Sequence, residues 1–116
     1  DYVKEKNPKI FEGITPIFLA ANDGHFEICK ILISLIDDKN PASNLGDTPL
    51  HVAAKEGHLN ICKLILDNVK IKNPSNIDGI TPLQMASEKG FKDICKLFTE
   101  SRDENEGMKF KKRRVF

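Results

Sequence analysis

Residues 46–58 decide the fold of this chain, and they read Gly46-Asp47-Thr48-Pro49-Leu50-His51-Val52-Ala53-Ala54-Lys55-Glu56-Gly57-His58. A closely similar stretch begins thirty-three residues earlier, at Gly13, and another begins thirty-three residues later, at Gly79. A fixed period of this size is typical of architectures in which one small unit is stacked on copies of itself. The sequence therefore predicts an array of repeated units.

Each copy carries the signals that start and stop a short helix. In the middle copy, the hydroxyl of Thr48 can accept a hydrogen bond from the free N–H groups of the first turn. Pro49 follows at the position where its missing N–H is not needed, and the small pair Ala53-Ala54 lets neighbouring helices approach closely. Gly57 stands where a helix must end in a left-handed conformation. A first helix is therefore predicted between Pro49 and Gly57.

A second helix is predicted after each of these glycines. Ile61-Cys62 and Ile65-Leu66 occupy positions i, i+1, i+4 and i+5, which form one apolar stripe on a helix, and Ile28-Cys29 with Leu32-Ile33 repeat this stripe in the first copy. The lysine after each cysteine falls off the stripe and should face solvent (Lys30, Lys63 and Lys96). The connection to the next copy contains an Asn-Pro step, which favours extended backbone and predicts a projecting loop.

The period divides the chain into the end of a preceding repeat over residues 1–12, repeats over residues 13–45, 46–78 and 79–101, and a charged tail over residues 102–116. The first assignment depends on Lys6-Asn7-Pro8, which recurs as Lys39-Asn40-Pro41. Because the chain starts with Asp1 rather than Met, we expect an excised fragment whose first repeat is uncapped. That repeat should fray first or associate with another copy.

The third copy differs from the first two as a terminal unit should. Positions that are apolar or small in the second copy become polar, as at Ser87, Lys92 and Thr99. The outer face of a terminal repeat meets water instead of a neighbour. A fourth copy would begin at Lys112, where basic residues stand instead, so we expect the array to end here.

Composition and charge argue against several classes of function. The 116 residues contain no apolar run long enough for a membrane span and no signal-like segment. The net charge is +1 and residues 102–114 contribute +3, which leaves the rest of the chain at −2, without the basic surface that nucleic acid requires. The sequence contains no phosphate-binding glycine loop and no acid–base pair. It therefore predicts no enzyme, no catalytic residue, no cofactor and no small-molecule substrate.

The three cysteines, Cys29, Cys62 and Cys95, are thirty-three residues apart and hold the same position in three units. Their spacing does not match a zinc finger. Equivalent helices in a stack lie about 8–10 Å apart, beyond the limit of about 7 Å between bridged Cα atoms. We therefore expect small buried thiols, no metal, and a reducing intracellular setting in the cytoplasm or nucleus.

The repeated pattern Gly-x-Thr-Pro-Leu-His-x-Ala-Ala-x-x-Gly-His, with Ile-Cys-Lys-Leu on the second helix, resembles the ankyrin repeat. The resemblance implies an all-α fold, a solenoid of stacked helix-turn-helix units with projecting β-turn loops. It also implies that His51 makes a hydrogen bond between repeats, and His25 and His58 are interpreted as structural in the same way. Phe18 and Gln84 replace this histidine in the other copies, and Asn-Pro replaces the Gly-Ala-Asp usual after the second helix.

The resemblance also implies a function, because ankyrin-like arrays bind partner proteins on the concave surface formed by loop tips and first helices. The candidate contacts at the tips are Phe11, Glu12, Ile14, Asn44, Leu45, Asp47, Ile77, Asp78 and Ile80. Those on the first helices are Phe18, Asn22, Asp23, Lys55, Glu56, Glu88 and Lys89. Clustered apolar tip residues indicate a contact surface, although Ile14 and Ile80 could instead tuck against neighbouring loops.

The close of the chain suggests an alternative function. Basic residues are interleaved there with apolar ones, and the basic residues are Lys109, Lys111, Lys112, Arg113 and Arg114. Such a segment could bind nucleic acid, an anionic membrane or the nuclear import machinery, as part of an anchoring or regulatory array in a larger protein. The simpler interpretation is a solvated terminus.

Overall fold

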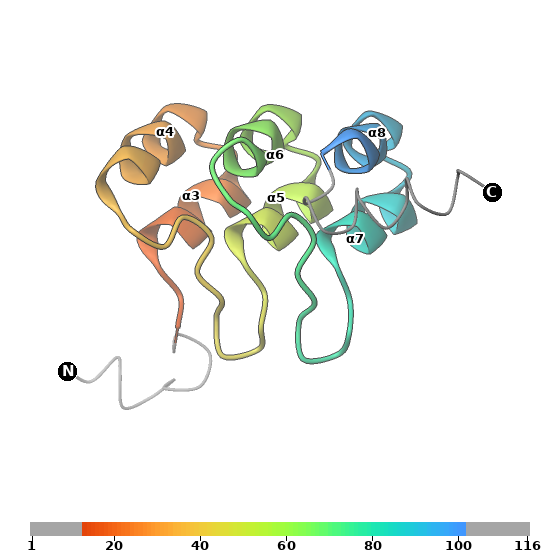
Figure 1. Cartoon of the computed structure of the whole chain (residues 1–116), viewed down its shortest axis with the longest axis horizontal. Helices are drawn as coiled ribbons and strands as arrows, with labels where there is room; N and C mark the ends of the chain where they lie inside the picture. The colour runs from red at the N-terminus through yellow and green to blue at the C-terminus, as the bar shows by residue number, and fades with distance from the viewer. Residues whose placement is uncertain (1–12, 102–116) are drawn as a thin grey trace.

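The computed structural model describes residues 13–101 of the chain. Over these residues the chain forms six helices in three consecutive pairs: α3 (Pro16–Asp23) with α4 (Phe26–Leu35), α5 (Pro49–Glu56) with α6 (Leu59–Leu66), and α7 (Pro82–Lys89) with α8 (Lys92–Glu100). Figure 1 shows the three pairs in a row, with the second helix of each pair above the first. The predicted all-α array of stacked helix-turn-helix units is confirmed.

The helix caps form as the sequence predicts. Thr48 precedes α5 in extended backbone, and its hydroxyl accepts a hydrogen bond from the N–H of His51 at 3.2 Å. Pro49 opens the helix, and Gly57 ends it in the left-handed conformation (φ 82°), with its N–H donating to the carbonyl of Ala53. The equivalent threonine, proline and glycine act in the same way at α3 and α7. The caps are therefore local to each unit.

The helix pairs stack in two layers. α5 packs between α3 and α7, and α6 packs between α4 and α8. The alanines of the first helices are buried at these contacts (Ala20, Ala21, Ala53, Ala54 and Ala86). The middle pair thus has a neighbour on both sides, and it supplies most of the large, fully buried side chains of the core: Leu50, Ile61, Ile65 and Leu66.

The projecting loops end in hydrogen-bonded turns, which we call the first finger (residues 43–47) and the second finger (residues 76–80). In the first finger, the N–H of Ser43 donates to the carbonyl of Asp47 at 2.8 Å, and the N–H of Gly46 donates to the carbonyl of Ser43 at 2.9 Å. Asn76, Gly79 and Ile80 repeat this arrangement in the second finger. Figure 1 shows both fingers extending below the helices, as predicted for β-turn loops.

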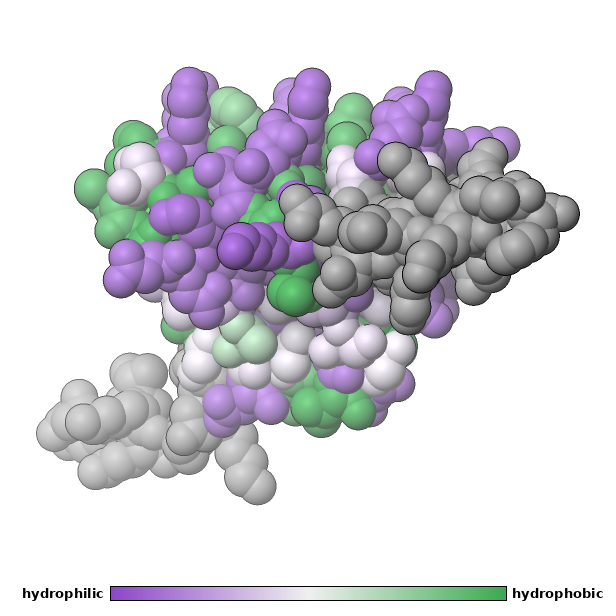
Figure 2. All heavy atoms as spheres, in the orientation of Figure 1, coloured by the Kyte–Doolittle hydropathy of each residue, from purple (hydrophilic) through white to green (hydrophobic). Residues whose placement is uncertain are grey.

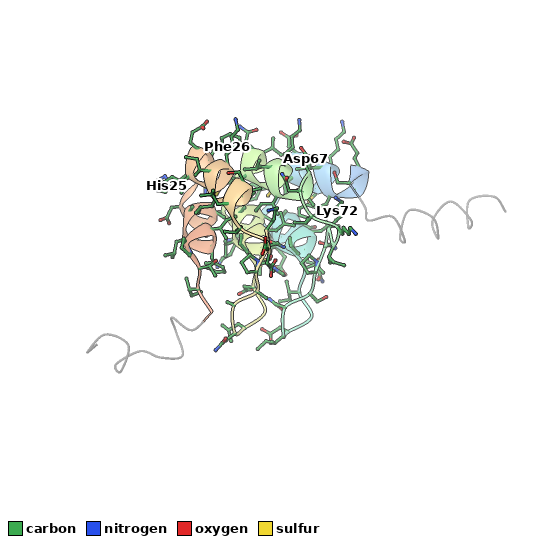
Figure 3. All side chains as sticks on the ribbon, turned by 60° about the vertical axis from the view of Figure 1, so that its left-hand side comes forward. His25, Phe26, Asp67 and Lys72 are labelled. Carbon is green, nitrogen blue, oxygen red and sulfur yellow. The ribbon has the colours of Figure 1, made fainter. Side chains whose placement is uncertain are left out.

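The recurring Lys-Asn-Pro segment joins each second helix to the next unit. The ammonium group of Lys72 donates to the carbonyl of Leu66 at 2.7 Å, at the end of α6, and also to the carbonyl of Val69. The side-chain oxygen of Asn73 accepts from the N–H of Leu83, in the first turn of α7, at 3.2 Å. Lys39 and Asn40 make the equivalent bonds one unit earlier. Figure 3 shows where Lys72 and Asp67 lie, close to the end of α6.

Two predictions about burial are wrong in part. Ile28, expected on the inward stripe with Cys29, is 49% exposed, whereas Ile61 at the same position of α6 is 2% exposed. Cys29 and Cys62 are fully buried, but Cys95 is only half-buried. Both exceptions lie in an end pair, and each end pair has a neighbouring pair on one side only among the described residues.

The predicted solvent-facing positions are confirmed. Lys30, Lys63 and Lys96 are all exposed on the second helices. In the α7–α8 pair, Ser87, Lys92 and Thr99 are exposed as well. The outer side of this last described pair is therefore polar, as the departures of the third copy predict.

Candidate partner-binding surface

The two fingers bring together the two most exposed apolar residues among the predicted tip contacts that the structure describes. Leu45 in the first finger is 60% exposed, and Ile77 in the second finger is 67% exposed. The N–H of Ile77 donates to the carbonyl of Leu45 at 3.0 Å, so the two residues are neighbours across the fingers. Figure 2 shows apolar surface at the lower end of the molecule, where the fingers lie. We call Leu45 and Ile77 the tip patch.

The polar residues around the tip patch have different roles. Asn44 and Asp78 are exposed beside it. Asp47 is half-buried, and its carboxylate accepts from the side-chain amide of Asn76 at 2.9 Å. The side-chain oxygen of Asn76 also accepts from the N–H groups of Asp78 and Ile80, which keeps the second finger folded. Asp47 therefore connects one finger to the next, a role that was not predicted from the sequence.

The other predicted tip residues are less accessible or lie outside the described residues. Ile14 and Ile80 are half-buried, in agreement with the alternative that they tuck against neighbouring loops. Phe11 and Glu12 lie outside residues 13–101, as do the segment 1–12, the tail 102–116 and its basic residues.

The candidate residues on the first helices fall into two groups. Five are exposed and lie in the last turns of α3, α5 and α7: Asp23, Lys55, Glu56, Glu88 and Lys89. Phe18 is instead half-buried against the core, and Asn22 is half-buried. Only the helix ends therefore combine exposure with charge, and the charges there are of both signs.

His51 links the middle unit to the second finger. The ring is fully buried, and its Nδ1 accepts from the backbone N–H of Thr48 at 3.1 Å, so the proton of the neutral ring is on Nε2. Nε2 donates to the carbonyl of Ile80 at 2.9 Å. Burial lowers the pKa of His51, and the bond to Ile80 and the charge of Asp47 offset this in part. The hydrogen bond between repeats that the resemblance implies is confirmed.

His58 joins the first two units by a different contact. Its Nε2 lies 3.1 Å from the carbonyl oxygen of Asn22, and its ring lies against Gly24. A Cβ atom added to Gly24 would come within 2.8 Å of the ring, so this position needs glycine for space as well as for its φ of 81°. His25 holds the same position before α4 but is exposed and makes no capping hydrogen bond (Figure 3), so its structural role remains a prediction.

The surface between the connecting loops was not predicted from the sequence. A hollow of about 480 Å³ lies between residues 37–42 and residues 68–74. Ile71 lies on its lining and is strongly exposed. One difference between copies could have indicated this surface in the sequence, because Ile71 stands where the first copy has Asp38.

The described residues offer little for catalysis. Within residues 13–101, no three His, Cys, Asp or Glu side chains are grouped so that they could hold a metal ion. Burial raises the pKa of the Cys62 thiol to about 12, and it raises the pKa of Cys29 as well, so neither is a ready nucleophile. In the same part of the chain, every helix is too short or too polar to serve as a membrane span.

The family of this chain follows from its comparison with known proteins. A model described as ankyrin repeats (3 copies) matches residues 2–76, which is more than half of the chain, so the chain belongs to the ankyrin repeat family. The α7–α8 pair lies beyond the matched residues and has the same caps. A search of curated proteins found no match. Ankyrin repeats are generally protein-interaction modules and are typically non-catalytic, and no enzyme family was detected.

Proposed function

We propose that this chain is a non-enzymatic binding module that docks a partner protein on the finger and first-helix face. The observation that carries the proposal is the tip patch, in which two large apolar side chains remain more than half exposed on adjacent, hydrogen-bonded fingers. Exposed apolar side chains that cluster and are rimmed by polar groups are typical of a protein contact surface. The fingers are already held by hydrogen bonds, so they lose little conformational freedom on binding.

The surroundings of the tip patch indicate the chemistry of the partner. Asn44 and Asp78 form a polar rim at the tips, and the ends of α5 and α7 present one acidic and one basic side chain each. This mixed charge does not favour a polyanion such as nucleic acid, which requires a basic surface. The proposed partner is therefore a protein segment with apolar anchors and both signs of charge at its rim.

The test is binding of the captured partner to variants of the full chain, with contacts mapped by NMR shifts. Leu45→Ala and Ile77→Ala should each weaken binding about tenfold or more, because burial of such a side chain is worth about 1.5–3 kcal/mol. Ile71→Ala is the matched control, since Ile71 is equally exposed but lies on the loop surface away from the tips. Unchanged affinity of both tip variants would contradict the assignment of this face.

The alternative function, binding of nucleic acid, anionic lipid or import machinery by the basic tail, is supported by sequence alone. It predicts a steep loss of affinity with salt and loss of binding when residues 109–116 are deleted. Affinity that barely changes between low and physiological salt would exclude it. For either function we propose an intracellular location, which the buried free thiols of Cys29 and Cys62 favour.

A further inference from the structure

A buried histidine connects the second finger to the helices. The neutral ring of His51, on α5, donates from Nε2 to the carbonyl of Ile80 at 2.9 Å. Ile80 is the last residue of the second finger, and Thr81 and Pro82 follow it at the start of α7 (Figure 1). The base of this finger is therefore held by a side chain that can take up a proton in mild acid.

The hydrogen bonds of the ring require its neutral form. Nδ1 of His51 accepts from the N–H of Thr48 at 3.1 Å, and it lies 2.9 Å from the hydroxyl oxygen of the same residue. A proton on Nδ1 would bring two donors face to face and leave the buried N–H of Thr48 without its acceptor. The protonated ring would also carry a charge in a fully buried position. Protonation therefore favours a state in which the ring has left this position and the bond to Ile80 is broken.

The charged groups around the ring do not remove this preference. The carboxylate of Asp47, in the first finger, favours the protonated form, but burial has the larger effect and lowers the pKa of His51. The helices α3, α6 and α7 pack against α5, and within residues 13–101 none of them brings a charged side chain that changes this pKa. The bonded ring is therefore stable above the ordinary histidine pKa of about 6.5, and this stabilisation is lost as the pH falls below it.

The first finger is held differently at its base. Phe18 holds the position of His51 on α3, and a phenyl ring neither donates a hydrogen bond of this kind nor takes up a proton. The carbonyl of Asp47, which is equivalent to that of Ile80, accepts from the N–H of Ser43 within the finger at 2.8 Å. The bond that mild acid removes from the second finger therefore has no equivalent at Phe18 in the first.

The second finger carries half of the tip patch. The N–H of Ile77 donates to the carbonyl of Leu45 in the first finger. The side-chain amide of Asn76 donates to the carboxylate of Asp47. Ile77 is strongly exposed, so its bond competes with water, whereas the bond made by His51 is buried. The position of Ile77 beside Leu45 therefore depends on the buried bond at the base of the finger.

We propose that the bond from His51 is a pH-sensitive link, and that mild acid releases the second finger from α5 and moves Ile77 away from Leu45. The turn itself stays folded, because the side-chain oxygen of Asn76 keeps its bonds inside the finger. One protonated group changes the ratio of released to linked chains by up to about tenfold per pH unit below about pH 6.5. Release would also weaken partner binding, and this consequence alone rests on the function proposed for the tip patch.

The first test is amide hydrogen exchange of the full 116-residue chain, followed by NMR between about pH 7 and about pH 5 and corrected for the intrinsic exchange rates. The protection of the Ile77 amide should fall by up to about tenfold per pH unit as the ring of His51 takes up a proton. The amides of Gly46 and Gly79, each bonded within its own finger, should keep their protection. Equal losses at all three amides would indicate unfolding of both fingers and would overturn the proposal.

The second test compares the same amides in the His51→Gln variant. Glutamine is the residue at the equivalent position of α7, and its side chain does not titrate. The Ile77 amide of this variant should be less protected at pH 7 than in the unmodified chain, and its protection should not depend on pH. His25 and His58 are present in both chains, so their protonation contributes equally to both. An Ile77 amide with the same pH dependence in the two chains would overturn the proposal.

Both measurements are made without a partner, so they test the link separately from the function of the tip patch. Loss of Ile77 protection in acid, absent from the variant, supports the link whether or not a partner docks on Leu45 and Ile77. Protection of Ile77 that is constant while the ring of His51 takes up a proton would overturn the link and leave the proposed function in place.

Discussion

Ile28 in α4 and Ile61 in α6 occupy the same position of successive helix pairs, but Ile28 is 49% exposed and Ile61 is 2% exposed. Leu19 and Val52 differ in the same direction on the first helices. The residue types and their spacing are equivalent, so the difference comes from the helix pair that covers α5–α6. In this array, the neighbouring unit decides whether such a side chain is buried, whereas a helix cap forms within a single unit.

The largest difference in unfolding free energy should appear when Ile28 and Ile61 are each replaced by alanine. Ile61→Ala should cost about 2–4 kcal/mol of unfolding free energy, because it removes buried methyl groups and leaves a cavity. Ile28→Ala should cost less than about 1 kcal/mol, because the side chain is half exposed and alanine favours a helix. Urea unfolding of the two variants measures this. Equal losses would contradict the dependence of burial on the neighbouring pair.

Gly57 and Gly90 allow a second comparison between a position that contacts the next unit and an equivalent position that, among residues 13–101, does not. Gly57 and Gly90 both end a first helix with φ near 80°, so alanine should cost about 1–2 kcal/mol of backbone strain at either position. A Cβ at Gly57 would also come within 2.9 Å of the ring of Phe91 in the next unit, whereas no atom of residues 13–101 outside its chain neighbours lies within 4 Å of a Cβ at Gly90. Displacing that ring should add about 0.5–1.5 kcal/mol. Thermal unfolding should therefore give Gly57→Ala the lower Tm, and equal Tm values would argue against this contact.

Because the pKa of His51 is lowered, we expect the free energy of unfolding to depend on pH. Its pKa is lowered in the folded state, so its contribution to stability is complete above the unfolded value of about 6.5 and is lost as the pH falls below it. In the His51→Gln variant, the glutamine should still cap α5, because Gln84 at the same position of α7 accepts a hydrogen bond from the N–H of Thr81. The free energy of unfolding of this variant should be about 1–2 kcal/mol lower at neutral pH, and it should depend less on pH in the acid range. If the free energy of unfolding falls equally steeply between pH 7 and pH 5 in the variant and in the unmodified chain, His51 is excluded as the source of this pH dependence.

The smallest effects should come from the lysines that cap the second helices. Lys39→Met and Lys72→Met each remove hydrogen bonds to carbonyl groups at a helix end, which should cost about 0.3–1 kcal/mol. The two losses should be equal, because both bonds stay near one helix end and neither depends on a neighbouring pair. Chemical denaturation measures them, and clearly unequal losses would show that these caps are not local.

The sequence predicted the local features of the fold well. The thirty-three-residue period, the threonine caps and the terminating glycines depend on residues close in sequence, and all are confirmed. The exposure of Ile28 and Cys95 was not predicted, because a period assigns a position in the unit and does not say whether another pair covers it. The roles of Lys72 and Asn73 were not predicted either, although their recurrence was visible.

The candidate site was predicted in part for the same reason. Leu45 and Ile77 were expected at the tips and are exposed there as neighbours. Asp47 and Phe18 stay candidate contacts, and the structure adds structural roles that were not predicted, since Asp47 bonds to the next finger and Phe18 packs on the core. Such bonds between fingers depend on the distance between units, which no single repeat encodes.

The dependence of burial on a neighbouring pair is tested most directly by amide hydrogen exchange in α4 and α6. We expect α4 to exchange faster than α6, because among residues 13–101 α4 has a neighbouring helix pair on one side only, whereas α6 has one on both sides. Equal protection of α4 and α6 would contradict this explanation.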